Sequence, residues 1–465
     1  MTARLSILHL NDIYEIAPVS GGRCGGLARV AELRRRLLAD NPHTLVTFAG
    51  DLCSPSALGA VVVDGAPLKA RHGVAVMNRL GLDVMTFGDH ELNTVGLPEF
   101  LGQLAASRFR IVSSNIHDAA GAPFPGVVER HVFEFGENPE GGPRIGILGL
   151  TKPVRLPTFA FRQTDCLEAA AAQLEALAGE ADFIIALTHQ PLAADRELVA
   201  RFPAIDLLLG GDDHHHVCLR HAGTPIVKSD SNARSVTVVE VDFQAVGGAR
   251  IDARQVPITP ALPEEPDTRA EIQYWLDGAF RALRAGGWEP TEVVATTDRE
   301  LDGFESSVRQ HRTALTDLIT AAMCRVAEGT ELALLCSWWL RLDDGFPPGA
   351  GITRYDLLRL FAYGDSPVHR VRVAGGLVET ILDFGEARRG SGSYILTSAN
   401  VVRESACWRI NGAPLDRRRH YDVAMADDLL GDYLFHIDPV RTPSVVVQGE
   451  YPSLREAVVQ ELRRR

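Results

Sequence analysis

The sequence predicts a layered α/β/β/α domain over residues 1–260, a linker with a connecting helix over residues 261–288, and a smaller α+β domain over residues 289–465. Three observations predict this fold class. Apolar segments of strand length alternate with helical patterns up to about Val256, as expected for buried sheets that helices cover. Most of these strands end in polar clusters. The acidic, proline-rich segment 262–267 then precedes a half with a different pattern.

The first half contains more predicted strands than helices. Three amphipathic or alanine-rich segments predict helices at 28–39, 72–80 and 165–179. Runs of apolar, often β-branched residues predict strands at 5–10, 44–48, 83–87, 110–115, 144–150, 182–188, 205–209, 225–229 and 235–241.

The second half reads as a mixed α+β region. Asp267 is suited to cap a helix over 268–285, because its carboxylate can accept hydrogen bonds from the first free amides. After Gly286 and Gly287, a helix is predicted at 314–328. Strands are predicted at 332–336, 369–373, 393–397, 408–411 and 421–425.

Composition narrows the class of protein. The chain has 465 residues, 46% hydrophobic and 23% charged, as is typical of globular proteins. Its net charge of −13 argues against binding to a nucleic acid polymer. A strand begins almost at Met1 and no apolar segment reaches membrane-spanning length, so we expect a cytoplasmic protein with no membrane contact. The seven scattered cysteines contain no CxxC pair and are expected to be reduced.

Polar clusters follow five strands of the first half. Carboxyl ends of parallel strands meet at one edge of a sheet, so these side chains are expected to converge. Such a gathering of carboxylates and imidazoles needs cations, and two metal ions bridged by one carboxylate would suit hydrolysis at phosphorus. The clusters are Asp12-Ile13-Tyr14, Gly50-Asp51, Gly88-Asp89-His90-Glu91, Thr188-His189-Gln190 and 210–216.

Structural roles remain open for some of these residues. Asp12 and Asp51 could instead serve as caps. The run His214-His215-His216 is not expected to supply three ligands, because adjacent side chains of an extended chain point apart. We expect one ligand from this run.

Blocks in this order resemble the calcineurin-like metallophosphoesterases, specifically the 5′-nucleotidase family with its C-terminal substrate-binding domain. The blocks are "ILHLNDIYEI", "GGLARV", "GDLCSPS", "MNRLGLDVMTFGDHELNTVG", "SSNI", "LTHQ" and "LLLGGDDHHH". The Asp-x-Tyr start is similar to a branch that carries Tyr where most members carry His. The resemblance implies a metallophosphoesterase domain followed by a 5′-nucleotidase-type domain.

The resemblance also implies roles for residues in the first half. Asp12 and His214 would bind the first metal ion, His189 the second, and Asp51 both. His90 would contact the scissile phosphate in the transition state. The implied activity is hydrolysis of a phosphate monoester, a nucleotide or a related phosphorylated metabolite, by a metal-bound hydroxide. Two divalent ions are the implied cofactors.

Four positions depart from the family pattern. Asp89 replaces an asparagine ligand, Asp212 a histidine and Tyr14 another histidine, while Asn93 replaces the aspartate that partners the catalytic histidine. Two added carboxylates favour Mn²⁺ or iron, with Mg²⁺ or Zn²⁺ as alternatives. Tyr14 could ligate iron or pack beside the site. Without a carboxylate partner, His90 is expected to act more slowly or differently.

The second half resembles the substrate domain more loosely. The blocks "LDGFESSVRQHRTALTDLITAA" and "CSWWLRLDDGFPPGAGITRYDLLRLFAYGDSPVHRVRVAG" imply substrate contacts by Arg309, Arg341, Tyr363 and Asp365. Packing alone is the alternative for Tyr363. Alternative activities are a phosphodiesterase or cyclic-nucleotide hydrolase, a sugar-phosphate hydrolase, or a repurposed scaffold that uses metal for redox or for binding.

Overall fold

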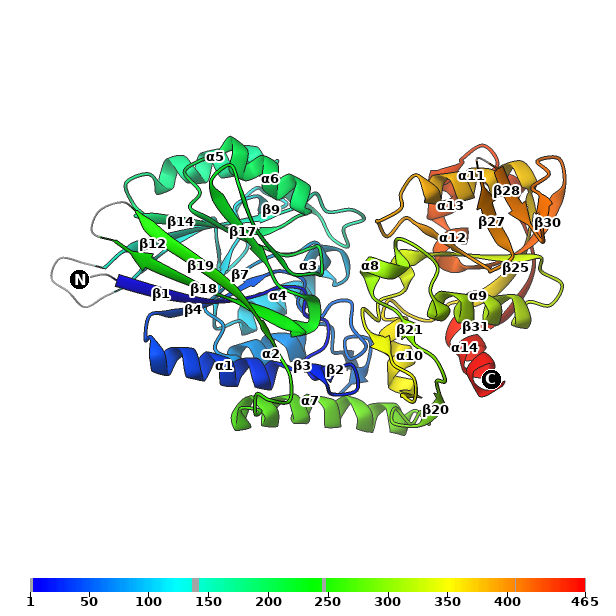
Figure 1. Ribbon diagram of the computed structural model, residues 1–465, viewed down its shortest axis with the longest axis horizontal. Helices are drawn as coiled ribbons and strands as arrows, with labels where there is room; N and C mark the ends of the chain where they lie inside the picture. The colour runs from blue at the N-terminus through cyan, green and yellow to red at the C-terminus, as the bar shows by residue number, and fades with distance from the viewer. Residues whose placement is uncertain (1–2, 136–141, 245–247, 406, 465) are drawn as a thin grey trace. The chain divides into compact units, whose positions relative to one another are not determined.

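A computed structural model describes residues 3–135, 142–244, 248–405 and 407–464. The chain divides into two compact units, Met1–Ala282 and Leu283–Arg465 (Figure 1). Among the residues described, none of the helices has the length and apolarity needed to cross a bilayer.

The first unit is built on two sheets. In one sheet, β1, β4, β7 and β8 run parallel to one another; in the other, β12, β14, β15 and β17 do so. The first sheet has the order β10 (Val127–Val128), β8 (Arg110–Val112), β7 (Val84–Thr86), β4 (Thr44–Ala49), β1 (Ala3–Leu10), β18 (Ser235–Phe243) and β19 (Ala249–Pro257). The second has the order β11 (Arg130–Glu134), β12 (Arg144–Thr151), β14 (Phe183–His189), β15 (Leu207–Gly210), β17 (Thr224–Lys228) and β16 (Val217–His221).

The two sheets enclose a core and carry helices on their outer faces. Ile7 and Leu45 of the first sheet pack in one buried cluster with Ile147 and Ile185 of the second. Helix α1 (Leu27–Asp40) covers the first sheet together with α2 (Arg71–Leu80) and α4 (Leu97–Ala106), and α5 (Cys166–Leu177) and α6 (Leu192–Arg201) cover the second (Figure 1). The predicted α/β/β/α layering is therefore confirmed. The predicted strands and helices of this half are present, with ends shifted by at most three residues.

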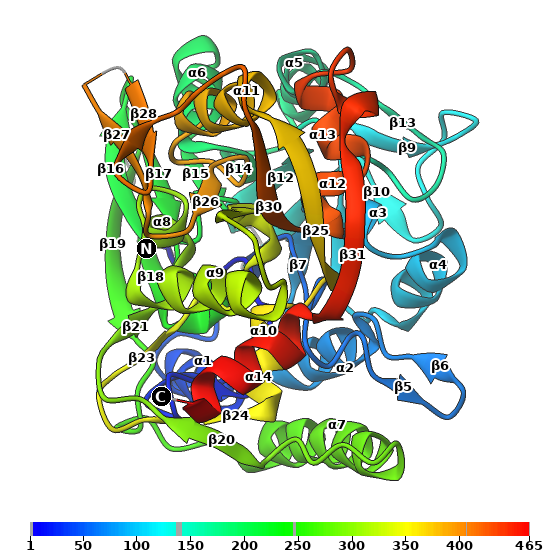
Figure 2. The same cartoon turned by 90° about the vertical axis from the view of Figure 1, so that its right-hand side faces the viewer.

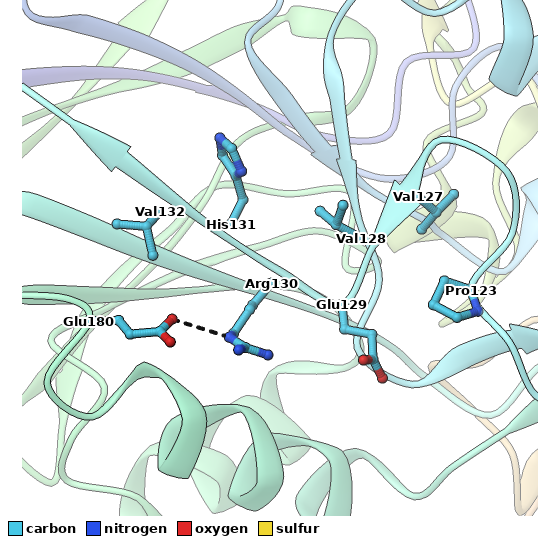
Figure 3. A pocket seen from close by; sticks show the side chains of 8 residues that line it. All are labelled: Pro123, Val127, Val128, Glu129, Arg130, His131, Val132 and Glu180. Carbon is cyan, nitrogen blue, oxygen red and sulfur yellow. Dashed lines mark ion pairs between the residues drawn. The ribbon is translucent and has the colours of Figure 1, made fainter.

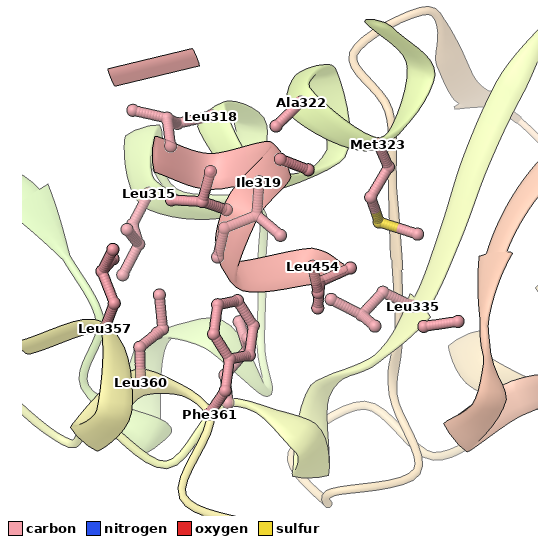
Figure 4. Close-up of a cluster of buried hydrophobic side chains, with 14 of the residues drawn as sticks. Leu315, Leu318, Ile319, Ala322, Met323, Leu335, Leu357, Leu360, Phe361 and Leu454 are labelled. Atoms are coloured by element: carbon pink, nitrogen blue, oxygen red, sulfur yellow. The ribbon is translucent and has the colours of Figure 1, made fainter. Parts of the chain in front are cut away.

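The second unit packs helices on both faces of one mixed sheet (Figure 2). Alternate residues of β22 point to opposite faces: Leu335 joins a cluster with α9 and α14 (Figure 4), whereas Leu334 joins one with α11. The sheet has the order β26 (Ile395–Thr397), β22 (Leu332–Cys336), β30 (His420–Ala426), β25 (Pro367–Ala374) and β31 (Val446–Ser453). The helices that pack on this sheet include α9 (Ala314–Val326), α11 (Gly375–Glu386) and α14 (Leu454–Arg464), and α7 (Pro266–Ala285) precedes this region in the chain.

Candidate metal centre

The predicted ligands of the first unit follow the carboxyl ends of strands from both sheets. Asp12 follows β1, Asp51 follows β4, and Asp89 follows β7. His189 is the last residue of β14, and Asp212 follows β15. Since the strands within each set run parallel, their polar ends meet at one edge, as the sequence predicted.

The backbone at this edge adopts conformations that are uncommon for residues other than glycine. The φ angles of Asp12, Asp51, Asp212 and His214 are 52°, 63°, 78° and 59°. Left-handed non-glycine residues carry strain and concentrate at functional sites. Hydrogen bonds between the two loops help to hold the backbone here, from the Asp12 amide to Gly50 O (3.1 Å) and from the Ile13 amide to Asp51 O (3.0 Å).

Glycine is required where the strand ends approach most closely. A Cβ atom on Gly88 would lie 2.1 Å from Asp51 Oδ1, and one on Gly211 would lie 2.5 Å from the carbonyl oxygen of Ala49. Both distances fall far below ordinary contact, so these positions leave no room for a side chain. The same closeness brings the Asp51 carboxylate next to the loop that carries Asp89.

His189 presents an unused nitrogen to three carboxylates. Its Nδ1 donates to the carbonyl oxygen of Ala49 (2.7 Å), which leaves Nε2 as the nitrogen with a lone pair in the neutral ring. Nε2 lies 3.5 Å from Asp51 Oδ2, 3.5 Å from Asp89 Oδ1 and 3.9 Å from Asp212 Oδ1. It is buried and makes no hydrogen bond to the residues described. A histidine fixed in this way is suited to bind a cation.

The candidate ligand atoms form three overlapping groups. Within each group the atoms lie within 4.8 Å of one another. Asp51 belongs to two of the groups, in keeping with the bridging role that the resemblance implies. The groups are Asp12, Asp51 and His189; Asp51, Asp89 and His90; and Asp89, His189 and Asp212.

Tyr14 and His214 lie beside the first group. The Tyr14 hydroxyl is 2.8 Å from Asp51 Oδ2 and 3.1 Å from His214 Nε2. His214 Nε2 is in turn 3.3 Å from Asp12 Oδ1. The phenol of Tyr14 therefore lies among the candidate ligand atoms, while its ring also packs on those of His90 and His214.

Asn93 orients His90 without adding charge. His90 Nδ1 lies 3.0 Å from Asn93 Oδ1, and Nε2 lies 3.6 Å from Asp51 Oδ2. Because the amide oxygen accepts, the bond places the proton on Nδ1 and turns Nε2 towards Asp51. The Asn93 amide nitrogen also lies 3.4 Å from Asp89 Oδ2, so one side chain connects His90 with Asp89.

Lys152 is a member of the centre that the sequence reasoning missed. Its ammonium nitrogen lies 3.1 Å from Asp89 Oδ1 and contacts Asp212 Oδ1. Two signals could have found it. Lys152 directly follows β12, so the strand-end rule applies to it as well. The chain also has 47 lysines and arginines, of which only Lys69, Lys152 and Lys228 are lysines.

Charged neighbours decide the protonation of these groups. Burial alone would raise the pKa of Asp12, but His214 and His189 hold it below its usual value. Burial would likewise raise the pKa of Asp89, and His90 and Lys152 bring it well below. Burial would lower the pKa of His189, yet Asp51 and Asp89 raise it well above its usual value. The centre is thus a set of carboxylates that attracts cations.

The donors around Asp12 and Asp51 fit a divalent cation, because both carboxylates are buried and His214 Nε2 lies 3.3 Å from Asp12 Oδ1. The group of Asp89, His189 and Asp212 already holds the ammonium of Lys152. An ion bonded to Asp89 Oδ1 at about 2.1 Å would lie within about 5.2 Å of Lys152 Nζ. At an effective dielectric constant of about 20, a divalent ion and an ammonium at that distance repel by about 6 kcal/mol.

Two further buried residues position the loops. Glu91 accepts hydrogen bonds from the amides of Gly88 (2.7 Å) and Leu52 (2.7 Å), and burial together with Asp51 raises its pKa to about 7. Lys228 donates to the carbonyl oxygens of Gln190 (2.7 Å) and Gly211 (2.8 Å), and so ties together the loops after β14 and β15. Neither role was predicted.

Two family models match this chain. Residues 5–216 match the calcineurin-like phosphoesterase model, and residues 293–433 match the 5′-nucleotidase C-terminal domain. The chain thus carries a calcineurin-like phosphoesterase domain followed by a 5′-nucleotidase C-terminal domain. The resemblance inferred from the sequence blocks and the predicted two-domain fold class are both confirmed.

Individual relatives of this phosphoesterase are distant. It is 25% identical over 435 residues to the trifunctional nucleotide phosphoesterase protein YfkN of Bacillus subtilis, covering 84% of this chain and 28% of that protein. It is 26% identical over 365 residues to human 5′-nucleotidase, covering 69% of this chain and 59% of that protein. The chain thus spans less than two thirds of the length of these two relatives.

Solved structures share the fold over almost the whole chain. A 5′-nucleotidase precursor from Thermus thermophilus superposes with a TM-score of 0.79 at 22% identity, covering 99% of this chain and 96% of that one. The sulfate thiohydrolase SoxB from the same organism superposes with a TM-score of 0.76 at 16% identity, covering 99% of this chain and 94% of that one.

In the 5′-nucleotidase-type domain, the two predicted substrate arginines share one carboxylate. Glu305, which is 2% exposed, lies 2.6 Å from Arg341 NH1 and also contacts Arg309. The guanidinium of Arg341 stands 5.7 Å from the ring centre of Tyr363. The Tyr363 ring lies 5.2 Å from that of Trp338, so an aromatic cluster and an arginine pair lie together.

The fourth predicted substrate residue, Asp365, bonds to its own domain. Its Oδ1 accepts from the amides of Ser366 and Arg455, each at 3.1 Å. These bonds join the start of α14 to the loop before β25, which is a structural role. A substrate contact by Asp365 stays a prediction.

Figure 3 shows a pocket in the phosphoesterase domain. Residues 127–132, Pro123 and Glu180 line it, and Arg130 pairs with Glu180 at 3.5 Å. It contains none of the candidate ligands.

Proposed function

We propose that this calcineurin-like phosphoesterase hydrolyses phosphate monoesters of nucleotides or related phosphorylated metabolites in a metal-dependent reaction. Residues 1–260 would form the catalytic domain, residues 289–465 the substrate-binding domain, and residues 261–288 their connection. One observation carries the proposal: several metal-ligating side chains lie around Asp51 at one edge of the sheets. They are the imidazoles of His90 and His189 and the carboxylates of Asp12 and Asp89.

Asp12, Asp51 and His214 would hold a divalent cation in this proposal, with Tyr14 beside it. Oxygen-rich donors favour Mn²⁺ or iron, and Mg²⁺ or Zn²⁺ are alternatives. Such a cation would supply Lewis acidity for water activation and for the charge on phosphoryl oxygens. The second of the two expected ions would have to displace Lys152 from Asp89 and Asp212.

The protein's own groups would bind and orient the substrate. His90, held at Nδ1 by Asn93, would in its doubly protonated form donate a hydrogen bond from Nε2 to a phosphoryl oxygen next to Asp51. Arg309 and Arg341 would contact anionic or hydroxyl groups of the substrate, with Tyr363 against its flat part. Asp365 would make a further contact with the substrate.

The test measures phosphate release from a panel of nucleoside monophosphates, sugar phosphates and p-nitrophenyl phosphate, with and without Mn²⁺. We expect stimulation by Mn²⁺ and a loss of at least about 10²-fold in kcat for Asp51→Asn. Asp40→Asn is the matched control, because Asp40 is exposed and pairs only weakly with Arg4. An Asp51→Asn variant as active as the control, or activity indifferent to metal, would contradict the proposal.

Phosphodiester hydrolysis is the second candidate. The Bacillus subtilis relative is named a trifunctional nucleotide phosphoesterase, which favours testing this activity. Rates on bis(p-nitrophenyl) phosphate against p-nitrophenyl phosphate separate the two activities. Stoichiometric iron in a coloured protein without phosphatase activity would instead favour a redox scaffold.

A further inference from the structure

Lys152 is placed in the centre by the pairing of two strands. In the parallel pair of β12 and β14, Thr151 lies opposite His189, and the Lys152 amide donates to the carbonyl oxygen of His189 (2.8 Å). The lysine therefore leaves its strand at the same edge as the candidate ligands. Its ammonium reaches Asp89 Oδ1 at 3.1 Å and contacts Asp212 Oδ1.

These two oxygens belong to one candidate cation group. Asp89, His189 and Asp212 offer three ligand atoms within 4.8 Å of one another, and Lys152 pairs with two of the three. An ammonium and a divalent ion that share these oxygens would repel strongly at such short range. One cation therefore tends to exclude the other.

The choice of lysine over arginine points the same way. Only three of the 47 lysines and arginines are lysines, so the chain uses arginine for most of its positive charges. An ammonium is a compact point charge, whereas a guanidinium is a broad planar fork. A compact cation between two carboxylate oxygens has the shape and charge distribution closest to those of a metal ion.

The carboxylates that Lys152 contacts are also the two that depart from the family pattern. Asp89 and Asp212 stand where asparagine and histidine are usual. Beside these two carboxylates, the ammonium of Lys152 already balances one of the two negative charges in an ion-pair network. The two departures and the lysine thus form one connected change.

We propose that the ammonium group of Lys152 takes the place of the second metal ion, so that the centre binds one divalent cation per chain, at Asp12, Asp51 and His214. This inference rests on the proposed function, since it concerns the metal content of the same site.

The test is the stoichiometry of Mn²⁺ on the full-length protein. Isothermal titration and elemental analysis after gel filtration give the number of ions per chain, and electron paramagnetic resonance separates isolated Mn²⁺ from coupled pairs. We expect one Mn²⁺ per chain in the wild type and two, magnetically coupled, in Lys152→Ala. Lys152→Ser is a second small, neutral variant with the same expected gain. Circular dichroism confirms that each variant is folded.

Arg155→Ala is the matched control, because Arg155 is an exposed cation in the same loop. It is expected to keep one Mn²⁺. Two ions in the wild type, or a single ion in both folded Lys152 variants, would overturn the inference. Two ions together with Mn²⁺-stimulated phosphatase activity would overturn it while the proposed function stands. No bound ion and no activity would overturn both.

Discussion

Replacement of Gly88 by alanine tests whether the close approach of two strand ends positions Asp51. Gly88 lies between β7 and Asp89, and a Cβ atom there would be 2.1 Å from Asp51 Oδ1 and 2.6 Å from the Asp51 amide nitrogen. Ordinary contacts of a Cβ begin at 3.4 Å. The carboxylate must therefore move by about 1.3 Å, or the two loops must separate by a similar distance.

Such a displacement has a predictable cost. A misplacement of about 1 Å in a catalytic constellation lowers the rate by about 10²-fold, and overpacking lowers the free energy of unfolding by about 1–3 kcal/mol. Mn²⁺ affinity measured by calorimetry should fall together with kcat, because Asp51 serves both. Urea denaturation measures the change in stability separately.

Gly102→Ala makes the same substitution where it should do no harm. Gly102 lies on α4, is exposed, and has no neighbour within 4 Å of an added Cβ. Alanine there should raise stability by about 0.5–1 kcal/mol and leave metal affinity unchanged. If Gly88→Ala bound Mn²⁺ as tightly as Gly102→Ala, the argument for the tight contact would be refuted.

Two further predictions concern buried charges. Burial raises the pKa of Asp428 to about 7, so the folded state keeps a proton that the unfolded state releases, and stability falls as the pH rises from about 4 to about 7. Asp428→Asn should reduce the difference in unfolding free energy between pH 5 and pH 8 by roughly 2–3 kcal/mol, and an unchanged pH profile would count against this burial effect. Lys228 lies 2.6 Å from Asp195 and 2.5 Å from Asp213, so Lys228→Met leaves both carboxylates without their shared cation. The free energy of unfolding measured in urea should fall by about 3–5 kcal/mol. A fall of less than about 1 kcal/mol would contradict this prediction.

The sequence predicted best those strands that are buried on both faces. All seven residues of β14 are buried, so the strand appears as a continuous apolar run. Strand β19 was missed because it is an edge strand in which most residues are exposed or half-buried, and its sequence ARIDARQVP contains no apolar run. Helix α4 has a proline at its second position and a glycine in its interior, which weakened its helical pattern.

The centre was predictable where it depends on strand ends and not where it depends on pairing between distant residues. The rule of polar strand ends selected Asp51, Asp89 and His189 because they are metal-ligating residue types. The same rule would have selected Lys152 if cations had been sought as well as ligands. The carboxylate that Arg309 and Arg341 share in the second domain comes from pairing across the fold, and sequence periodicity carries no information about it.

A charge count links Lys152 to the number of metal ions. Asp12, Asp51, Asp89 and Asp212 contribute −4 at a largely buried edge. Lys152 contributes +1 next to Asp89 and Asp212, which leaves a charge of −3. One divalent cation brings this charge to −1, whereas a second ion beside a retained Lys152 would give the buried centre an excess of +1. A second ion therefore requires Lys152 to leave these carboxylates.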